Sequence, residues 1–528
     1  MTSTTGAAIA TMAVLSASGL APTLALLGRR WVVLPLMPLT GSVLAALAAT
    51  GYLATGGTFL GWFVVLAVAG TAIAVVFWVR RPDHRPWRRP LLSWAPGQLW
   101  LSVVGALGAV AVLGACAWCL RGLATPTVGF DARALWLMRG GWFLQSHHQL
   151  LVKMRIPDIP LVQSVYPPLV SATTSLAWRV TGDQSQRLAV VVIALLNSCA
   201  VITASWALVE AGRSAALRLA SGDGGRRPAL VSRGAASGPA LPTGAAVVPM
   251  VVGVVSAVLL VFVAFGITEP FATNGYADPI WSLAAVGAVA YGLQAEASRA
   301  NLGVTVILIL VVGMSKDEGL ATGSLLIVLV ALRGVVTMAA GERRRRWWHP
   351  VLIGVAELVA IGAWPLVVRI VHARGLTSNY SPARLWASRA RASYDGMTPY
   401  LHVLALAIPV AVVGGLVLSR VRRRSGLAND WWAWTTLTGG LVAVIWAFAT
   451  GTVAIKPWLE GTVHRVTEFP ALAGWWIVAT WAVVAGCSLA PGAAEPMRAR
   501  RGTVGSEPAD VVDGPVPLAE PLSSAVGE

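Results

Sequence analysis

Long apolar segments, separated by short polar ones, dominate the pattern of residues along this chain. About twenty apolar residues are enough for a helix to cross the hydrocarbon layer of a membrane. The pattern therefore predicts an all-α protein that crosses a membrane many times. Eleven spans are predicted, at about residues 7–28, 31–53, 58–79, 97–120, 186–209, 245–268, 280–295, 350–371, 399–419, 431–455 and 470–490.

Two further apolar stretches are placed by requiring their flanking segments to end on the correct side of the membrane. Residues 301–332 have two cytoplasmic flanks and are interrupted by the charged segment SKDEG (315–319). They are predicted to form two short helices that cross and meet at a charged tip. Residues 167–178 cannot cross without reversing later spans, so they are predicted to form a short helix at the outer surface. The total is about thirteen membrane-spanning helices.

Arginine-rich segments give the orientation, because short cytoplasmic loops of membrane proteins carry an excess of Lys and Arg. They place the N-terminus outside and the C-terminus in the cytoplasm of a protein of the cell membrane. The N-terminal segment has no basic start, so it is predicted to be a first span and not a cleaved signal peptide. The arginine-rich segments are Gly28–Arg30, Arg80–Pro90, Arg213–Gly244, Arg343–Arg346 and Arg420–Arg424.

Composition separates membrane parts of the chain from others. Gly, Ala, Ser and Arg dominate residues 212–244, and Pro, Gly, Ser and late acids dominate residues 491–528, so both are predicted to be disordered and cytoplasmic. The membrane parts are a three-helix segment (1–90), the start of a core that includes the outer loop 121–185 (91–211), and the remaining core (245–490).

The charge of the chain fits a membrane protein better than a nucleic-acid-binding one. The formal net charge is +17, but the arginines gather in short loops between spans, where topology explains them, and no nucleic-acid partner is expected. The four cysteines lie within or at the ends of apolar segments and imply no disulfide framework. The chain contains no Walker-type phosphate loop.

The segment GFDARALWLMRGGWF (129–143) places an acid in the longest predicted outer loop. If the segment is helical, Asp131, Leu135 and Met138 share one face, and Trp136 and Arg139 share an adjacent face. Asp131 is then a candidate general base. An aspartate at the start of a helix can also serve only as an N-cap, so this alternative stays open.

Cations on the predicted outer side run against the positive-inside tendency. The three lysines of the chain, Lys153, Lys316 and Lys456, all fall there, together with about a dozen arginines. Binding of an anionic lipid phosphate would explain them, and so would contact with lipid headgroups. Lys316 is the strongest candidate for function, because it lies between two short intramembrane helices and next to two acids.

Carboxylates, cations and aromatic rings at one end of a helix bundle suit the transfer of a sugar from a lipid-phosphate donor. This reaction needs a base to deprotonate the acceptor hydroxyl, cations to stabilise the departing phosphate and aromatic faces to hold the sugar. We assign the base to Asp131 and phosphate binding to Lys316 and Arg465. Trp136 and Tyr166 are candidates for the aromatic contacts.

A set of short motifs in one order carries a resemblance to a known family. The chain is similar to the GT-C superfamily of membrane glycosyltransferases, and most to a bacterial branch that uses polyprenyl-phosphate sugars. The resemblance implies a GT-C-like helix bundle, an inverting reaction with Asp131 as base, and contacts of Arg139 and Arg465 with the donor phosphate. The motifs cover residues 130–470 and are Phe130-Asp131, Trp136, Arg139, YPPL (166–169), GYADP (275–279), KDEG (316–319) and WLEGTVHRVTEFP (458–470).

Several residues of these motifs allow more than one role. Asp278 could bind substrate, bind a metal or only begin a span, and Glu318 could bind substrate or only neutralise Lys316. The family branch usually has an acid before its Tyr-Pro, whereas this chain has Gln163–Val165. The family includes metal-dependent and metal-independent enzymes, so we assign no metal ligand, and a divalent cation stays an alternative. The substrate-binding candidates are Asp278, Glu318, Trp136, Tyr166, Tyr276 and His464.

Two functions of other classes compete with a glycosyltransferase. The protein could be a transporter or flippase for lipid-linked saccharides, or an inactive scaffold in a glycan-assembly complex. A transporter is expected to place charges and broken helices near the centre of the membrane, whereas the charges of this chain collect on one predicted side. The predicted partners are a polyprenyl-phosphate sugar, a glycan or lipid acceptor, and membrane lipids.

Overall fold

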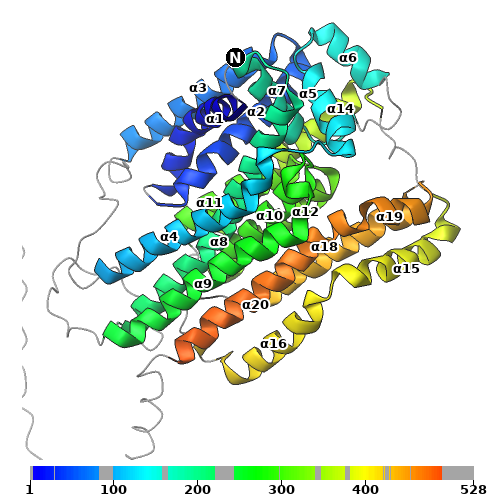
Figure 1. Cartoon of the computed structure of the whole chain (residues 1–528). Coiled ribbons are helices and arrows are strands. Elements are labelled where there is room, and N and C mark those ends of the chain that lie inside the picture. The colour runs from blue at the N-terminus through cyan, green and yellow to red at the C-terminus, as the bar shows by residue number, and fades with distance from the viewer. Residues whose placement is uncertain are drawn as a thin grey trace, which may run out of the picture. The chain divides into compact units, whose positions relative to one another are not determined.

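The computed structural model describes most of the chain up to residue 489, and every regular element in the described part is a helix (Figure 1). This confirms the prediction of an all-α membrane protein. The described residues are 4–28, 30–81, 99–156, 164–220, 243–295, 298–338, 346–374, 381–419, 421–422, 427, 430–451 and 453–489.

The long helices follow the predicted apolar segments closely. They are α1 (Thr4–Leu27), α2 (Val33–Thr55), α3 (Phe59–Arg80), α4 (Leu99–Cys119), α8 (Gln186–Ala220), α9 (Thr243–Thr268), α10 (Asp278–Ala288), α11 (Arg299–Gly313), α12 (Asp317–Thr337), α14 (Trp348–Ile370), α16 (Val403–Val417), α18 (Trp431–Thr450) and α20 (Glu468–Ser488).

Shorter helices connect them. They are η4 (Leu120–Ala124), η5 (Ala132–Leu137), α5 (Met138–Trp142), α6 (His147–Arg155), α7 (Leu169–Thr181), η6 (Phe271–Thr273), η7 (Val289–Gln294), η8 (Ala383–Leu385), α15 (Trp386–Met397), η9 (Thr398–Tyr400) and α19 (Ile455–Val466).

Ten helices of the described chain are long and apolar enough to cross a membrane, with α19 and α20 taken together as one. An eleventh arises if α16 is joined to the segment Ala383–Tyr400, from which it is bent by 79°. The helix formed by α10 and η7 and the 15-residue α11 fall below that length. The protein is therefore a multi-pass membrane protein in contact with lipids, and the total of thirteen crossings stays a prediction.

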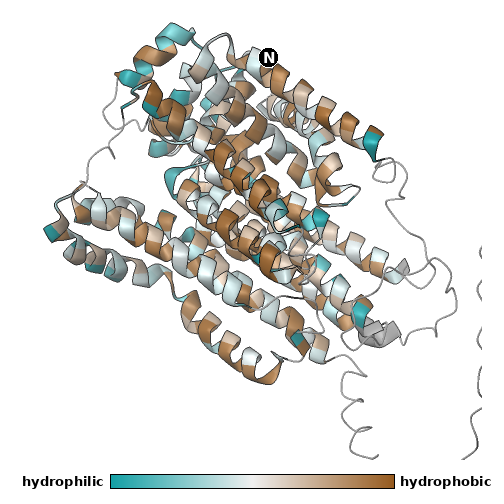
Figure 2. Cartoon of the chain, turned by 180° about the vertical axis from the view of Figure 1, so that it is seen from behind, coloured by the Kyte–Doolittle hydropathy of each residue, from teal (hydrophilic) through white to brown (hydrophobic). Residues whose placement is uncertain are grey.

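Burial separates central helices from peripheral ones. In their most apolar windows, α8 is 78% and α2 72% buried inside the protein, whereas α3 is only 17% buried. Exposed apolar side chains are tolerated on α3 because lipid tails surround it. Figure 2 shows hydrophobic residues along the long helices, as contact with lipid requires.

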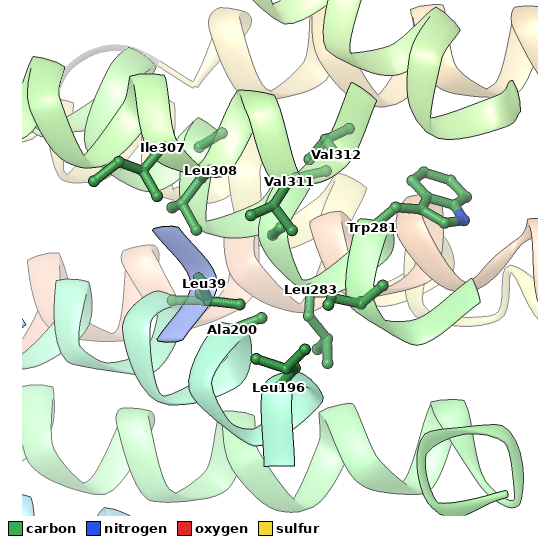
Figure 3. Packing of buried hydrophobic residues seen from close by; sticks show 14 of the residues in the cluster. Leu39, Leu196, Ala200, Trp281, Leu283, Ile307, Leu308, Val311 and Val312 are labelled. Carbon is green, nitrogen blue, oxygen red and sulfur yellow. The ribbon is translucent and has the colours of Figure 1, made fainter. Parts of the chain in front are cut away.

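The centre of the bundle is packed by large aliphatic side chains from four helices, α2, α8, α10 and α11 (Figure 3). Leu39 of α2, Leu196 of α8 and Leu308 of α11 are at most 1% exposed. Small residues bring the helix backbones together. A Cβ atom at Gly287 of α10 would lie 2.8 Å from the Leu308 side chain, so the glycine permits this close approach.

Two predicted boundaries are wrong. Helix α8 continues to Ala220, well beyond the predicted end of the span at residue 209, so the loop predicted for 212–244 begins later. Apolar residues such as Leu217 extend the helix, and the composition rich in Gly and Ser that defined the loop only starts after it. Residues 221–242 of that loop and the predicted tail 491–528 lie outside the described residues.

Helix α7 (Leu169–Thr181) corresponds to the short surface helix that was predicted for residues 167–178. At about 1.5 Å per residue, its 13 residues are too few to span a membrane. This agrees with the prediction that residues 167–178 do not cross. However, every residue from Leu169 to Trp178 is buried by other helices, including α2 and α8. The helix is therefore a core element and not one that rests on the membrane surface.

Gly319 in the first turn of α12 lets this helix approach α11 closely. A Cβ atom there would lie 2.3 Å from the Val312 carbonyl oxygen, which is backbone and cannot rotate away. We expect Gly319→Ala to destabilise the protein by about 1–3 kcal/mol through overpacking, measured as a lower thermal unfolding temperature in detergent. Gly362→Ala in α14 is the matched control, because its Cβ atom would meet nothing within 4 Å. Equal unfolding temperatures for the two variants would contradict this packing.

Candidate functional site

A cavity of about 310 Å³ opens where segments far apart in the sequence meet. One side is built by the loop that leads into η5 and by the start of α10, together with the turn between α11 and α12. The other side is built by the C-terminal end of α18 and by α19. The lining residues are Phe130, Asp131, Ala134, Leu135, Trp136, Tyr166, Asp278, Lys316, Glu318, Val444, Ala447, Phe448, Trp458, Thr462, Arg465 and Val466.

Five charged residues along this cavity form an alternating row of acids and bases, here called the ion-pair chain. Asp131 Oδ2 lies 2.5 Å from Arg465 Nη1, and the same nitrogen lies 3.7 Å from Asp278 Oδ2. The other oxygen of Asp278, Oδ1, accepts a hydrogen bond from Lys316 Nζ at 2.6 Å. Lys316 Nζ in turn lies 3.3 Å from Glu318 Oε1. Three carboxylates thus surround two cations.

The centre of the ion-pair chain is buried and its ends face the cavity. The side chains of Asp278, Lys316 and Arg465 are 1%, 7% and 8% exposed, whereas those of Asp131 and Glu318 are 24% and 20% exposed. A buried charge without a partner is costly, so each central group depends on its neighbours. The two terminal carboxylates are the most exposed members of the ion-pair chain.

Lys316 stays charged in this environment. Burial alone would lower the pKa of its ammonium group, but the carboxylates of Asp278 and Glu318 outweigh burial and leave the pKa above its ordinary value. The residue precedes the first turn of α12, where its extended backbone directs the side chain away from the helix. A permanent positive charge therefore lines the cavity.

Asp131 stands at the start of the helical segment but does not cap it. Its side chain makes no capping hydrogen bond and accepts one from Arg465 instead. The structure thus shows a role in the ion-pair chain in place of the capping alternative. The segment is helical as predicted, although its first part, η5, is a π-helix with wider turns. Leu135 shares the cavity face with Asp131, whereas Met138 is not among the lining residues.

Tyr276 contacts both Asp131 and Arg465. Its hydroxyl accepts a hydrogen bond from the backbone N–H of Asp131 at 3.4 Å, and the Arg465 guanidinium lies 4.9 Å from the centre of its ring. Burial, followed by the nearby Asp131 carboxylate, raises the pKa of the Tyr276 hydroxyl. The chain approaches this ring at Gly129, where a Cβ atom would lie 2.1 Å from it. Only a glycine fits there.

Aromatic side chains form another part of the cavity wall. The rings of Trp136 and Tyr166 are stacked, with centroids 5.4 Å apart and an angle of 15° between their planes. Arg465 is the one charged residue among the lining residues that α18 and α19 contribute, and near it Phe448 meets Trp458 edge to face, with ring centroids 4.7 Å apart. The cavity therefore combines one charged wall with flat aromatic and apolar surfaces.

Arg139 is not among the residues that line the cavity. It is fully buried, and its Nη2 donates a hydrogen bond of 2.6 Å to the Tyr166 carbonyl oxygen. Its guanidinium also lies 5.6 Å from the ring of Trp364, whose Nε1 donates to the Val165 carbonyl oxygen. Burial lowers the pKa of Arg139 to about 9, which leaves it charged near neutral pH. The geometry points to a role in holding Tyr166.

His464 also lies outside the lining. Its ring packs 4.8 Å from Phe271 and 6.0 Å from Tyr400, so it belongs to an aromatic group next to Arg465. His147, at the start of α6, is also absent from the lining. His147 lies against Tyr52, with Nε2 3.1 Å from the Leu53 carbonyl oxygen.

The described residues do not fit a divalent cation at the ion-pair chain. The space between Asp131 and Asp278 is taken by the Arg465 guanidinium, and both oxygens of Asp278 face cationic groups. In the part of the chain that the structure describes, no three His, Cys, Asp or Glu side chains are grouped closely enough to hold a metal ion.

Several site residues were not predicted. Trp458 and Thr462 lie seven and three positions before Arg465 on α19, so helical periodicity places all three on one face and could have revealed them. Glu468 lies behind Asp278. It is 1% exposed, and its Oε2 accepts a hydrogen bond of 3.4 Å from Ser282 of α10. Glu468 belongs to the motif at residues 458–470, but only the packing of α20 against α10 brings it to Ser282, one turn from Asp278.

Comparison of the chain with models of known protein families, with characterised proteins and with solved structures found no match.

Proposed function

We propose that the protein is a glycosyltransferase of the cell membrane, with a GT-C-like fold of thirteen spans and an active site on the extracytoplasmic side. It moves a sugar from a polyprenyl-phosphate donor to a hydroxyl group of a glycan or lipid acceptor. One observation carries the proposal. An ion-pair chain with a reachable carboxylate at each end lines a cavity that also has aromatic and apolar walls, in a protein of membrane-spanning helices.

In the proposed reaction, Asp131 accepts the proton of the acceptor hydroxyl. The hydroxyl oxygen attacks the anomeric carbon of the donor from the side opposite the phosphate and forms the new glycosidic bond. The bond between that carbon and the phosphate oxygen breaks, and its electron pair leaves with the polyprenyl phosphate. The configuration at the anomeric carbon is inverted. The donor supplies the driving force, so no nucleotide hydrolysis is needed.

Lys316 and Arg465 are the proposed phosphate-binding groups. As the phosphate leaves, its negative charge grows. The two cations on the cavity wall therefore stabilise the transition state more strongly than the ground state. Both are buried and held in place by Asp278, so they need little reorganisation when the reaction occurs. Asp278 therefore acts as a positioning residue that keeps the two cations close together.

The stacked pair Trp136 and Tyr166 offers a flat surface for a sugar ring, and its placement supports that role. Arg139 then positions Tyr166 through the backbone instead of touching phosphate. The prenyl chain has a matching apolar surface in Val444, Phe448 and Val466, since these residues face the same cavity.

Purified protein in liposomes tests the proposal. The donors are polyprenyl-phosphate pentoses and hexoses, and the acceptors are glycans and glycolipids extracted from bacterial cell envelopes. We expect release of polyprenyl monophosphate from one donor only when acceptor is present, with an inverted anomeric configuration in the product.

Two other results would reject a glycosyltransferase. Movement of the donor between leaflets without release of polyprenyl monophosphate would favour a flippase. No release and no movement with any donor would favour a scaffold. Asp183→Asn is the control for intact protein, because this exposed acid belongs to the loop between α7 and α8 and does not line the cavity.

A further inference from the structure

The Arg465 guanidinium serves two carboxylates unequally. Its Nη1 lies 2.5 Å from Asp131 and 3.7 Å from Asp278, and its Nη2 donates to the Gly461 carbonyl oxygen at 3.3 Å. Its Nε has no hydrogen-bond partner among the described residues, although it is buried. The shortest contact of Arg465 is thus with the proposed base, and part of its donor capacity is unused.

This contact holds the side chain that the proposed function assigns as the base. The Oδ2 atom of Asp131 accepts the hydrogen bond from Arg465, so its carboxylate is one partner of an ion pair. In the arrangement seen here, the proposed base is the closest charged partner of a proposed phosphate-binding group.

A phosphate is the natural competitor for this guanidinium. Phosphate oxygens form strong, often paired hydrogen bonds with arginine. A phosphate is also negatively charged, so it competes with a carboxylate for the same guanidinium. Asp131 is 24% exposed at its side chain and can turn toward the cavity, whereas Asp278 is 1% exposed and binds both cations. An incoming phosphate therefore displaces the terminal acid and leaves the central one.

We infer that the phosphate of the donor acts as a switch: it takes Arg465 from Asp131 and so releases the proposed base from its ion pair. The inference rests on the proposed function for the role of Asp131 and goes beyond it by stating how that role is controlled. Glu318 stands in the corresponding position at the other end of the ion-pair chain, 3.3 Å from Lys316. The phosphate replaces it there in the same way.

This exchange couples donor binding to the base. Before the donor binds, the Asp131 carboxylate is paired with Arg465. After the donor binds, Asp131 is free next to the sugar that is to be attacked. Donor binding therefore releases the base at the place where the new bond is to form.

The inference is tested by binding of farnesyl monophosphate, which carries the prenyl phosphate group but no sugar. Asp131→Asn is expected to bind this probe about tenfold more tightly than the parent, because the probe no longer competes with a charged partner for Arg465. In an Arg465→Gln background, the same Asp131→Asn change is expected to leave the affinity unchanged. Isothermal titration calorimetry in detergent measures all four proteins of this cycle.

Two results of the cycle would overturn the inference. No tightening in Asp131→Asn would mean that the acid does not compete with phosphate. Equal tightening with and without Arg465 would mean that Asp131 only repels the anion through space. Asp183→Asn, which removes an exposed acid away from the cavity, is expected to bind like the parent.

A structure of the parent protein with farnesyl monophosphate gives a second test that does not depend on the folding of Arg465→Gln. We expect the contact between Arg465 and Asp131 to be broken and the phosphate to lie against Arg465. An unchanged contact of 2.5 Å beside bound phosphate would overturn the inference. Neither test needs turnover. The switch can therefore fail while sugar transfer holds, and sugar transfer can fail while the switch holds.

Discussion

Asp131→Asn is expected to slow sugar transfer by about 10²–10⁴-fold, the usual contribution of a general base. Asparagine has nearly the shape of aspartate, and its amide oxygen can still accept the hydrogen bond from Arg465. The cavity should therefore keep its form while it loses the group that accepts a proton. The measurement is the turnover rate at saturating donor and acceptor, followed by release of polyprenyl monophosphate.

The same variant gives an unusual combination of results if both proposals hold. It binds farnesyl monophosphate more tightly than the parent and yet transfers almost no sugar. General loss of structure cannot produce this combination, because a damaged site loses affinity as well. Transfer by Asp131→Asn at the rate of the parent would show that another group is the base.

Lys316→Met is expected to weaken farnesyl monophosphate binding by about 10- to 100-fold, the range of a lost hydrogen bond to a charged group. It is also expected to destabilise the fold by about 3–5 kcal/mol, because it breaks a buried ion pair. Asp278 would keep only Arg465 as a cationic partner, at 3.7 Å. Methionine fills most of the volume of the lysine stem, so a large void is not a cause. Calorimetry and thermal unfolding in detergent measure the two effects.

A second variant separates phosphate binding from folding. In Lys316→Met combined with Asp278→Asn, no buried carboxylate is left without its closest partner, so stability should recover while affinity for farnesyl monophosphate stays low. Lys456→Met is the matched control, because this lysine of α19 is exposed and does not line the cavity. A stable Lys316→Met variant that binds the probe as tightly as the parent would remove Lys316 from the phosphate site.

The membrane character and the positions of most helices could be predicted because they depend on local properties of the chain. Apolar stretches form helices in lipid, since the backbone has no water with which to hydrogen bond. The π-helical turns of η5 could not be predicted in this way. The extension of α8 to Ala220 was also missed. The residues that follow it are rich in Gly and Ser, and their composition was assigned to the whole segment from residue 212.

Part of the candidate site could also be predicted from charge alone. A charged residue next to apolar helices is costly unless it meets a partner, so Asp131, Asp278, Lys316 and Arg465 were expected to converge. The structure brings these four together in one cavity. It does not bring Arg139 there, because its fully buried guanidinium donates to the Tyr166 carbonyl oxygen instead. Sequence shows that a charge needs a partner but not which partner it finds.

The sequence by itself determined that the chain is a helical membrane protein, where most of its helices begin and end, and that acids and cations gather between particular helices. These properties follow from the cost of placing polar groups in lipid, which each segment meets locally. Only the tertiary structure decided that Arg465 lies between Asp131 and Asp278, that α7 is buried in the core, and that α18 and α19 supply the apolar wall. The two contacts of Arg465 join residues more than one hundred positions apart, and all of these arrangements depend on how whole helices pack, which no local pattern records.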